Sequence, residues 1–293
     1  MDSPHPTGIG LGLRSAFIEQ IDGGEADGAV AFLEVSPENY LWRGGRAVDQ
    51  LARIRDRFPL LGHGLGMNLG GVDPLDDRFF AELRRFLDAH PTPWYSDHLC
   101  MCHRGAEFHD LLPVPFSSES AVRVASRIRE AADRVERPML FENISYYLPM
   151  GEAQLSEAEF VSLVCEEADC GLLLDVNNAY VNAQNHGFDP YAWLERIPLE
   201  RVRQLHIAGH EAWDERTLID THGASVKEEV QAMMAWVVER IGPVPVLLER
   251  DNHIPPLADL LAEVAELDAI YQAAIGRWRG DAEVAAVGGA RHG

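Results

Sequence analysis

Histidine and carboxylate side chains recur along this chain directly after short apolar segments. Six successive segments each end in one or more such residues. An unpaired carboxylate or imidazole is costly to bury, so packing alone does not explain a pattern repeated so often. The polar side chains at these positions are His63; Asp97 and His98; Glu142 and Asn143; Asp175, Asn177 and Asn178; His206, His210, Asp220 and His222; and Glu249, Asp251 and His253.

The residue types indicate a catalytic metal site with nitrogen and oxygen ligands. Imidazole and carboxylate groups suit iron, manganese or zinc in open sites, whereas closed structural zinc sites favour cysteine. Any one of these side chains alone has a structural explanation, such as capping a loop or pairing with an arginine. Together they exceed what one ion with open positions binds, so we expect two or three ions bridged by a carboxylate such as Glu142. The candidate ligands are His63, His98, Glu142, Asp175, His206, Asp220, His222 and Glu249.

The apolar segments predict the elements that bring these residues together. Runs rich in Val, Ile, Leu and Phe are typical of strands buried on both faces, as in a parallel sheet. Strand–helix alternation of this kind predicts an α/β fold, a single (β/α)8 TIM barrel, in which the carboxyl ends of all strands form one face. The competing fold, an open doubly wound sheet, usually has a G-x-G-x-x-G turn after its first strand, and none follows here. The runs begin at Gly8, Ala31, Pro59, Pro93, Pro138, Gly171, Val202 and Val244.

Helix signals lie between these runs. Capping boxes, N-cap residues and apolar residues at helical spacing mark where several helices start. We expect residues 1–275 to form the barrel domain and residues 276–293, which are small and polar, to form a disordered tail. The signals are amphipathic patterns at residues 77–90 and 117–135, capping boxes at Ser156/Glu159 and Ser225/Glu228, an N-cap and proline at Asp189-Pro190, and an apolar pattern from Pro256.

Composition limits the partners and the compartment that we expect. Lys and Arg number 25 against 47 Asp and Glu in 293 residues, which gives a net charge of −22. Nucleic acids and anionic membranes are held largely through Lys and Arg, so we expect neither as a partner. No apolar run approaches the roughly 18 residues of a spanning helix, and no signal peptide is visible. With 4 cysteines, the chain fits a reducing compartment, and we expect a cytoplasmic protein.

Short motifs at these strand ends, taken in order, resemble those of a known family. They are similar to the multinuclear non-heme iron-dependent oxidative enzymes, the family of the methanobactin biosynthesis B subunit. The resemblance extends from Gly8 to about Leu267, and the family itself resembles a branch of the xylose-isomerase-like barrels. The motifs are GIGLGLR, EVSPENY, GHGLGMNLG, SDHLC, FENIS, LLLDVNNAYVNAQNHG, LHIAGH, DTHG and LLERD.

The resemblance implies a ligand set for each metal position. Behind the ligands, we predict that His210 and Asp251 orient ligands or relay protons. The implied positions are a first iron held by His63 and His98, a bridge from it through Glu142, a second iron completed by Asp175, His206 and Glu249, and a third held by Asp220 and His222 with Asn178 as a further candidate ligand.

The resemblance also implies an activity. Members of that family use dioxygen and a mixed-valence Fe(II)/Fe(III) pair to oxidise residues, commonly cysteine, in ribosomally made precursor peptides. The chain is therefore expected to be an O2-dependent, multinuclear iron oxidase that acts on a precursor peptide. A peptide thiolate can bind an open iron position, which lowers the pKa of the thiol and orients it. Family members often work with a separate protein that captures the leader segment of the precursor, so we expect such a partner.

Three other functions stay open from the sequence alone. A metal-dependent hydrolase of the endonuclease IV type has a similar barrel and ligand order, but its pattern places a histidine at the position of Asn178, and it would need a basic groove. A sugar isomerase would use mainly carboxylates around magnesium or manganese. A metal-carrying subunit without turnover would consume no dioxygen when a peptide is present.

Overall fold

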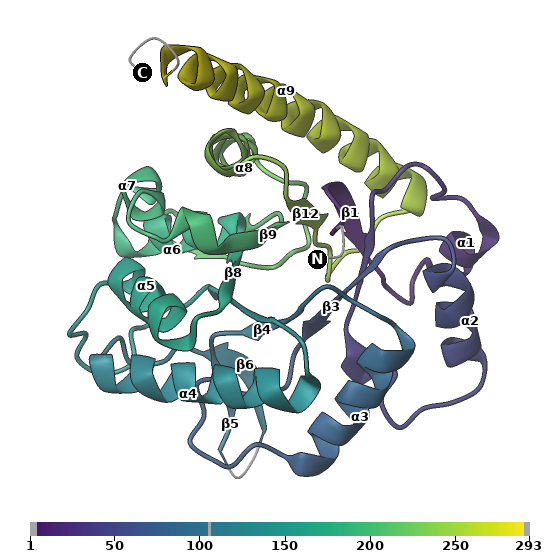
Figure 1. The fold of residues 1–293 in the computed structure, drawn as a ribbon, viewed down its shortest axis with the longest axis horizontal. Coiled ribbons are helices and arrows are strands. Elements are labelled where there is room, and N and C mark those ends of the chain that lie inside the picture. Colours follow the sequence, from purple (N-terminus) through teal and green to yellow (C-terminus); the bar gives the residue numbers. More distant parts are fainter. Residues whose placement is uncertain (1–4, 105–106, 290–293) are drawn as a thin grey trace.

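The chain closes into a barrel of parallel strands surrounded by helices, as its computed structural model shows (Figure 1). The structure describes residues 5–104 and 107–289. The barrel strands follow the order β1-β12-β9-β8-β7-β4-β3-β2, and β1 pairs with both β12 and β2 to close the ring. The predicted (β/α)8 TIM barrel is therefore confirmed.

Every apolar run that the sequence analysis identified contains a barrel strand. The barrel strands are β1 (Gly8–Gly12), β2 (Leu33–Val35), β3 (Leu60–Gly64), β4 (Tyr95–His98), β7 (Met139–Glu142), β8 (Gly171–Asp175), β9 (Val202–Ile207) and β12 (Pro245–Leu248). The α-helices are α1 (Ile18–Gly23), α2 (Arg46–Arg55), α3 (Asp77–Ala89), α4 (Ser118–Val135), α5 (Glu157–Ala168), α6 (Val176–His186), α7 (Pro190–Leu194), α8 (Glu228–Ile241) and α9 (Leu257–Gly289), and the 3-10 turns are η1 (Pro37–Asn39) and η2 (Leu199–Arg201).

Alternate residues on the strands, or directly before them, point into the barrel, where they form a small apolar cluster of their own. Residues between them, such as Leu33 and Leu60, belong to the main core under the surrounding helices. Side chains alternate along a strand, so the residue two positions after each inward residue also points inward. We call the small cluster the inner apolar cluster; its members are Phe32, Leu61, Trp94, Leu140, Leu173 and Leu247.

The helix caps match the sequence signals in two places and differ in a third. The capping box of Ser156 and Glu159 opens α5, and Asp189 caps α7 with a proline in its first turn. The predicted capping box of Ser225 and Glu228 is wrong, because Glu228 is the first residue of α8 and not the third. A glutamate at the first helical position cannot reach back to the N-cap backbone as the box requires.

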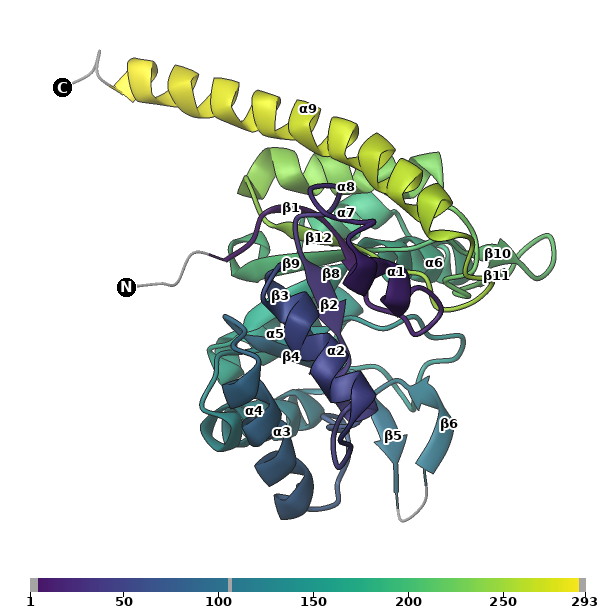
Figure 2. The same cartoon turned by 90° about the vertical axis from the view of Figure 1, so that its right-hand side faces the viewer.

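Two hairpins that the sequence analysis did not identify interrupt the strand–helix alternation. One consists of β5 (Met101–His103) and β6 (Glu107–Leu112), after β4. The other consists of β10 (Glu211–Ala212) and β11 (Leu218–Ile219), after β9. Both follow the carboxyl ends of barrel strands, and Figure 2 shows them on the same side of the barrel.

The C-terminal helix α9 extends beyond the expected end of the barrel domain. It continues to Gly289, whereas we expected a disordered tail from residue 276. The Trp278 ring lies against Gly242 at the end of α8, and α8 packs against α9, beneath which it lies in Figure 2. Residues 290–293 of the expected tail lie outside the described residues. Within the described part of the chain, no helix combines the length and apolar character needed to cross a bilayer.

Gly10 allows the Phe32 ring to fill the centre of the barrel. A Cβ at Gly10 would lie 2.4 Å from Phe32 Cζ. We expect Gly10→Ala to lower the free energy of unfolding by about 1–3 kcal/mol, because the added methyl group overpacks the inner layer. Gly23→Ala is the matched control, since a Cβ there meets nothing within 4 Å. Chemical denaturation measures both variants, and equal effects would contradict this packing.

Candidate metal centre

A ring of polar side chains lies one layer above the inner apolar cluster, at the carboxyl ends of the strands. The strand register places His63 beside Ser96 and Asp175 beside His206. Six of these polar side chains follow a residue of the inner apolar cluster by two positions in the sequence, and the seventh, His206, follows Gln204 by two positions. We call this set the polar ring; its buried members are Glu34, His63, Ser96, Glu142, Asp175, His206 and Glu249.

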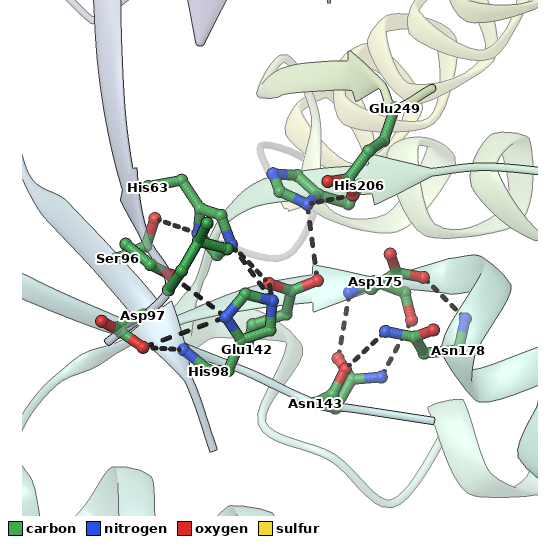
Figure 3. Close-up of polar contacts among 12 residues, drawn as sticks. His63, Ser96, Asp97, His98, Glu142, Asn143, Asp175, Asn178, His206 and Glu249 are labelled. Atoms are coloured by element: carbon green, nitrogen blue, oxygen red, sulfur yellow. Dashed lines mark hydrogen bonds and ion pairs between the residues drawn. The ribbon is translucent and has the colours of Figure 1, made fainter. Parts of the chain in front are cut away.

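His63, His98 and Glu142 form the first group of possible metal ligands, with ligand atoms within 4.8 Å of one another (Figure 3). The Nε2 atoms of the two imidazoles are 3.3 Å apart. Glu142 Oε2 lies 3.1 Å from His63 Nε2 and 3.4 Å from His98 Nε2. Three electron-pair donor atoms therefore face one small buried space.

Hydrogen bonds to the far nitrogen of each imidazole determine which nitrogen faces that space. His98 Nδ1 donates to the Gly64 carbonyl oxygen at 3.1 Å. His63 Nδ1 lies 2.9 Å from Ser96 Oγ, which donates its own hydrogen to the Gly62 carbonyl. The hydroxyl therefore accepts from His63. In the neutral imidazoles both Nε2 atoms direct lone pairs into the space, so only a cation, either a metal ion or an added proton, stabilises the arrangement.

Glu142 also belongs to a second group, completed by Asp175, His206 and Glu249. His206 Nδ1 lies 3.4 Å from Glu142 Oε1 and 3.3 Å from Glu249 Oε2. Glu142 therefore presents one carboxylate oxygen to each group, as a bridging ligand must. Asp175 Oδ1 accepts from the backbone N–H of Asn178 at 2.6 Å, while Asp175 Oδ2 is buried without a hydrogen-bond partner among the described residues.

Two asparagines fix the backbone around Asp175. The Asn143 side chain donates to the Asp175 carbonyl and accepts from the Asp175 N–H, both at 2.9 Å (Figure 3). Asn178 Nδ2 donates to the Asn143 carbonyl at 3.0 Å. Asn178 Oδ1 is buried, has no hydrogen-bond partner in residues 5–104 and 107–289, and is available as a ligand oxygen.

His222 lies among carboxylates and forms a third group with Glu249 and Asp251. Its Nδ1 is 3.2 Å from Asp251 Oδ2 and 3.5 Å from Glu249 Oε2. Its Nε2 is 2.8 Å from Asp220 Oδ1. The structure thus brings Asp220 and His222 together as expected and adds two further carboxylates. Although His222 Nε2 lies close to Asp220, it is buried without a hydrogen-bond partner in the described part of the chain, so the third group also holds an unsatisfied ligand atom.

His210 lies outside the three groups but is connected to them. Its Nδ1 is 2.8 Å from Asn177 Oδ1, and Asn177 Nδ2 donates to Asp220 Oδ1 at 2.7 Å. The His210 ring stacks on Tyr180 with centroids 5.2 Å apart. A continuous hydrogen-bond path therefore joins His210 to Asp220, while the relay or orienting role of His210 stays a prediction.

Arg14 and Glu34 are site residues that the sequence analysis did not identify. Arg14 Nε donates to Asp251 Oδ1 at 2.9 Å, and Arg14 Nη2 lies 3.3 Å from Glu249 Oε1. Glu34 is buried inside β2, with Oε2 at 3.0 Å from His206 Nε2. A signal was present for both, because each is a charged residue at an inward position in a quoted motif, GIGLGLR or EVSPENY.

The ionisable groups of the centre shift one another's pKa values. Burial alone would lower the pKa of His63, but the charge of Glu142 raises it to about 9. Burial would raise the pKa of Glu142, but the neighbouring imidazoles, His98 first, hold it well below its usual range. Burial raises the pKa of Asp175 well above its usual range, and the charge of Glu142 acts in the same direction. Without a metal the centre therefore holds extra protons, which a metal ion would displace.

Buried ligand atoms that no protein group satisfies support a metal site here. Leaving a buried polar atom without a partner costs about 1–3 kcal/mol, and more for a charged group. Within the described residues, several such atoms belong to the first and second groups or border them, which is the pattern that imidazole and carboxylate ligands of a metal would give. They include Glu142 Oε2, Asp175 Oδ2, Asn178 Oδ1 and His206 Nδ1.

Comparison with known proteins identifies the family. A sequence model described as "RiPP precursor modification enzyme MbnB/TglH/ChrH" matches residues 8–272, where RiPP denotes a ribosomally synthesised and post-translationally modified peptide. The chain belongs to the MbnB/TglH/ChrH family. A UPF0276 protein of Pseudomonas aeruginosa is 44% identical over 283 residues, which cover 96% of this chain and 97% of that protein. A UPF0276 protein of Neisseria gonorrhoeae is 44% identical over 270 residues, covering 92% and 96% respectively.

Solved structures share the barrel of this MbnB/TglH/ChrH family member at low sequence identity. A D-tagatose 3-epimerase-like protein matches with a TM-score of 0.58 and 13% identity, covering 94% of this chain and 99% of that one. Endonuclease IV from Thermus thermophilus matches with a TM-score of 0.57 and 16% identity, covering 92% and 99%. These likenesses concern the fold alone. The family match confirms the resemblance to this family and shows that the chain is an enzyme of the RiPP-modifying class.

One buried carboxylate of this MbnB/TglH/ChrH family member lies outside the three groups of the metal centre. Glu157, the first residue of α5, accepts from Asn182 Nδ2 at 3.3 Å and faces the Tyr146 hydroxyl. Burial nevertheless raises the pKa of Glu157 to about 8. The folded chain therefore disfavours the charged form of Glu157, and ionisation of this group destabilises the fold.

We expect the destabilisation by Glu157 to grow as the pH rises from its ordinary pKa of 4.5 to about 8. Over this window, Glu157→Gln should gain stability relative to the parent chain by up to about 1.4 kcal/mol per pH unit, with little difference near pH 4. Glu159→Gln is the control, because its stability relative to the parent chain should change with pH in the opposite direction. Its hydrogen bonds with Ser156 lower the pKa of Glu159, so its charge stabilises the fold at neutral pH. Urea denaturation at a series of pH values measures the free energy of unfolding of both variants. If this free energy depends on pH in the same way for Glu157→Gln and for the parent chain, the raised pKa of Glu157 is contradicted.

Proposed function

We propose that this enzyme is an O2-dependent, multinuclear iron oxidase that modifies a residue, most commonly cysteine, of a ribosomally synthesised precursor peptide. Membership of the MbnB/TglH/ChrH family supports a precursor peptide as substrate. The observation that carries the metal assignment is the meeting of two imidazole lone pairs and one shared carboxylate in a buried space. Iron accepts such ligands and changes oxidation state, which an oxidation requires and zinc does not provide.

The three groups supply a ligand set for each ion. Glu142 would bridge the first and second ions, because its two carboxylate oxygens face different groups. The proposed positions are a first iron at His63 and His98, a second at Asp175, His206 and Glu249, and a third at Asp220 and His222 with Asn178 as a further ligand.

Iron bound here would supply the redox chemistry, with dioxygen as the oxidant, and an open position for the substrate thiolate. The chain's own residues orient the ligands through hydrogen bonds. Arg14 holds Asp251 against His222 and so orients that imidazole. The path from His210 through Asn177 reaches Asp220. His210 borders a surface cavity of about 660 Å³ beside β10 and β11, and by holding the Asn177 amide it directs the amide N–H at Asp220 and so orients that carboxylate.

We place the peptide on the side of the barrel from which the two hairpins project. Most of the large apolar side chains that are exposed in the described chain lie on loops that follow barrel strands, where a polypeptide partner could cover them. A separate protein that captures the leader segment of the precursor would dock on the same side. The described part of the chain contains no disulfide bond, which fits a cytoplasmic location. The exposed residues on these loops are Trp42, Leu65, Val72, Tyr147, Leu148 and Trp213.

The metal content tests the iron assignment. Purified in air from iron-replete cells, the chain should hold about two or three iron ions and show a visible absorption band from ferric centres. Elemental analysis and absorption spectroscopy measure both properties. A chain that holds only zinc would contradict the oxidase and favour a metal-dependent hydrolase of the endonuclease IV type.

Removal of a bridging or terminal ligand tests the activity. Glu142→Ala and His98→Ala should abolish dioxygen consumption with a cysteine-containing precursor peptide and leave circular dichroism nearly unchanged. His186→Ala is the control, because His186 Nε2 contacts the Tyr146 carbonyl at 2.9 Å, outside the three groups. An oxygen electrode and the peptide's mass provide the measurements. Activity retained in both ligand variants would overturn the bridge, and a parent chain that consumes no dioxygen would be a metal-carrying subunit.

A further inference from the structure

A row of buried polar side chains runs beneath the second group, from Trp94 to His206. The Trp94 indole nitrogen donates to Gln204 Oε1 at 2.9 Å, and Gln204 Nε2 donates to Glu34 Oε2. Glu34 is 3% exposed, and Gln204 and His206 are fully buried. The row crosses the interior of the barrel, because Glu34 lies on β2 and Gln204 on β9, which are separated by β1 and β12.

The indole fixes the direction of the hydrogen bonds in this row. An indole nitrogen only donates, so the Gln204 atom that faces Trp94 is the amide oxygen. The Gln204 amide nitrogen therefore faces Glu34, whose carboxylate accepts. His206 Nε2 lies 3.0 Å from Glu34 Oε2 and 3.1 Å from Gln204 Nε2. A lone pair on His206 Nε2 would face the Glu34 carboxylate, so this nitrogen carries a proton and donates it to Glu34. The Glu34 oxygen then accepts from both His206 Nε2 and Gln204 Nε2, and the contact between these two donors is not itself a hydrogen bond.

His206 consequently presents Nδ1 to the metal centre, whereas His63 and His98 present Nε2. The Nδ1 atom of His206 faces one oxygen of Glu142 and one of Glu249. In a neutral imidazole whose Nε2 is protonated, Nδ1 is a lone pair directed between two carboxylates. A cation at this point removes the repulsion.

We propose that Glu34 is a positioning residue of the metal centre, which with Gln204 and Trp94 fixes His206 so that its Nδ1 lone pair points at the ion of the second group. The inference rests on the metal centre of the proposed function, but not on the identity of the metal or the peptide. A carboxylate that accepts from a ligating imidazole orients it and raises its basicity, and loss of such a carboxylate typically weakens metal binding by about 10–100-fold.

The alternative is that Glu34 itself binds an ion, because its carboxylate lies within 4.8 Å of ligand atoms of His63 and His206. The two roles predict different stoichiometries. If Glu34 is a ligand, replacing it lowers the number of ions that are bound at saturation. If Glu34 positions His206, replacing it leaves that number unchanged and lowers the affinity for the ion of the second group.

The test is a zinc titration of the metal-free full chain in competition with a chromophoric chelator. Glu34→Gln should bind as many Zn²⁺ ions as the parent chain. The dissociation constant of one of these ions should rise by about 10-fold or more. Trp94→Phe removes only the indole donor and should weaken the same ion less. Glu38→Gln is the matched control: Glu38 accepts from the Leu65 backbone N–H at 3.0 Å, so this variant should bind zinc like the parent.

A spectroscopic measurement distinguishes positioning from a general loss of stability. In the zinc-loaded parent chain labelled with ¹⁵N-histidine, one imidazole should be bound through Nδ1 and protonated at Nε2. The inference is overturned if every ligating imidazole binds through Nε2, if Glu34→Gln binds one ion fewer, or if its affinity equals that of Glu38→Gln. A parent chain that shows this zinc signature but carries no iron from cells would refute the proposed function and leave the role of Glu34 intact.

Discussion

Electron-pair donors gathered in one buried space require a cation among them, and this requirement governs the carboxyl end of the barrel. His63 and His98 direct Nε2 atoms that are 3.3 Å apart at the same carboxylate oxygen of Glu142. Without a metal, the centre meets the requirement with protons, which is why the pKa of His63 rises to about 9 against the effect of its burial. With a metal, the same atoms become ligands and the protons leave.

The barrel meets this requirement through the alternation of side chains along its strands. The inner apolar cluster lies deeper in the barrel, and two residues further along most of the strands the polar ring faces the mouth. Ligands of the first and second groups therefore lie on or directly after hydrogen-bonded strands, which hold them more rigidly than loops do. His222 differs, since it lies on a loop in the left-handed backbone region with φ of 47°. Such a conformation is uncommon for a residue with a Cβ and is typical of functional sites.

The sequence contained enough information for the barrel and most of the centre. Apolar runs mark strands buried on both faces, and polar residues at their ends stand out because burial is costly. Glu34 was not identified because it lies within the apolar run and not after it, and Arg14 because a basic residue is not a metal ligand. The start of α8 was misplaced because a Ser and a Glu at the right spacing do not specify which residue begins the helix. The hairpins leave only weak local signals, since β10 and β11 contain two residues each.

Anomalous X-ray scattering at the iron absorption edge, from crystals of the enzyme purified with its own metal, measures the central claim directly. We predict one anomalous peak about 2 Å from His63 Nε2, His98 Nε2 and Glu142, and a second peak at a similar distance from His206 Nδ1 on the other side of Glu142. Well-ordered crystals with neither peak, in which protonated imidazoles contact Glu142 directly, would contradict the account.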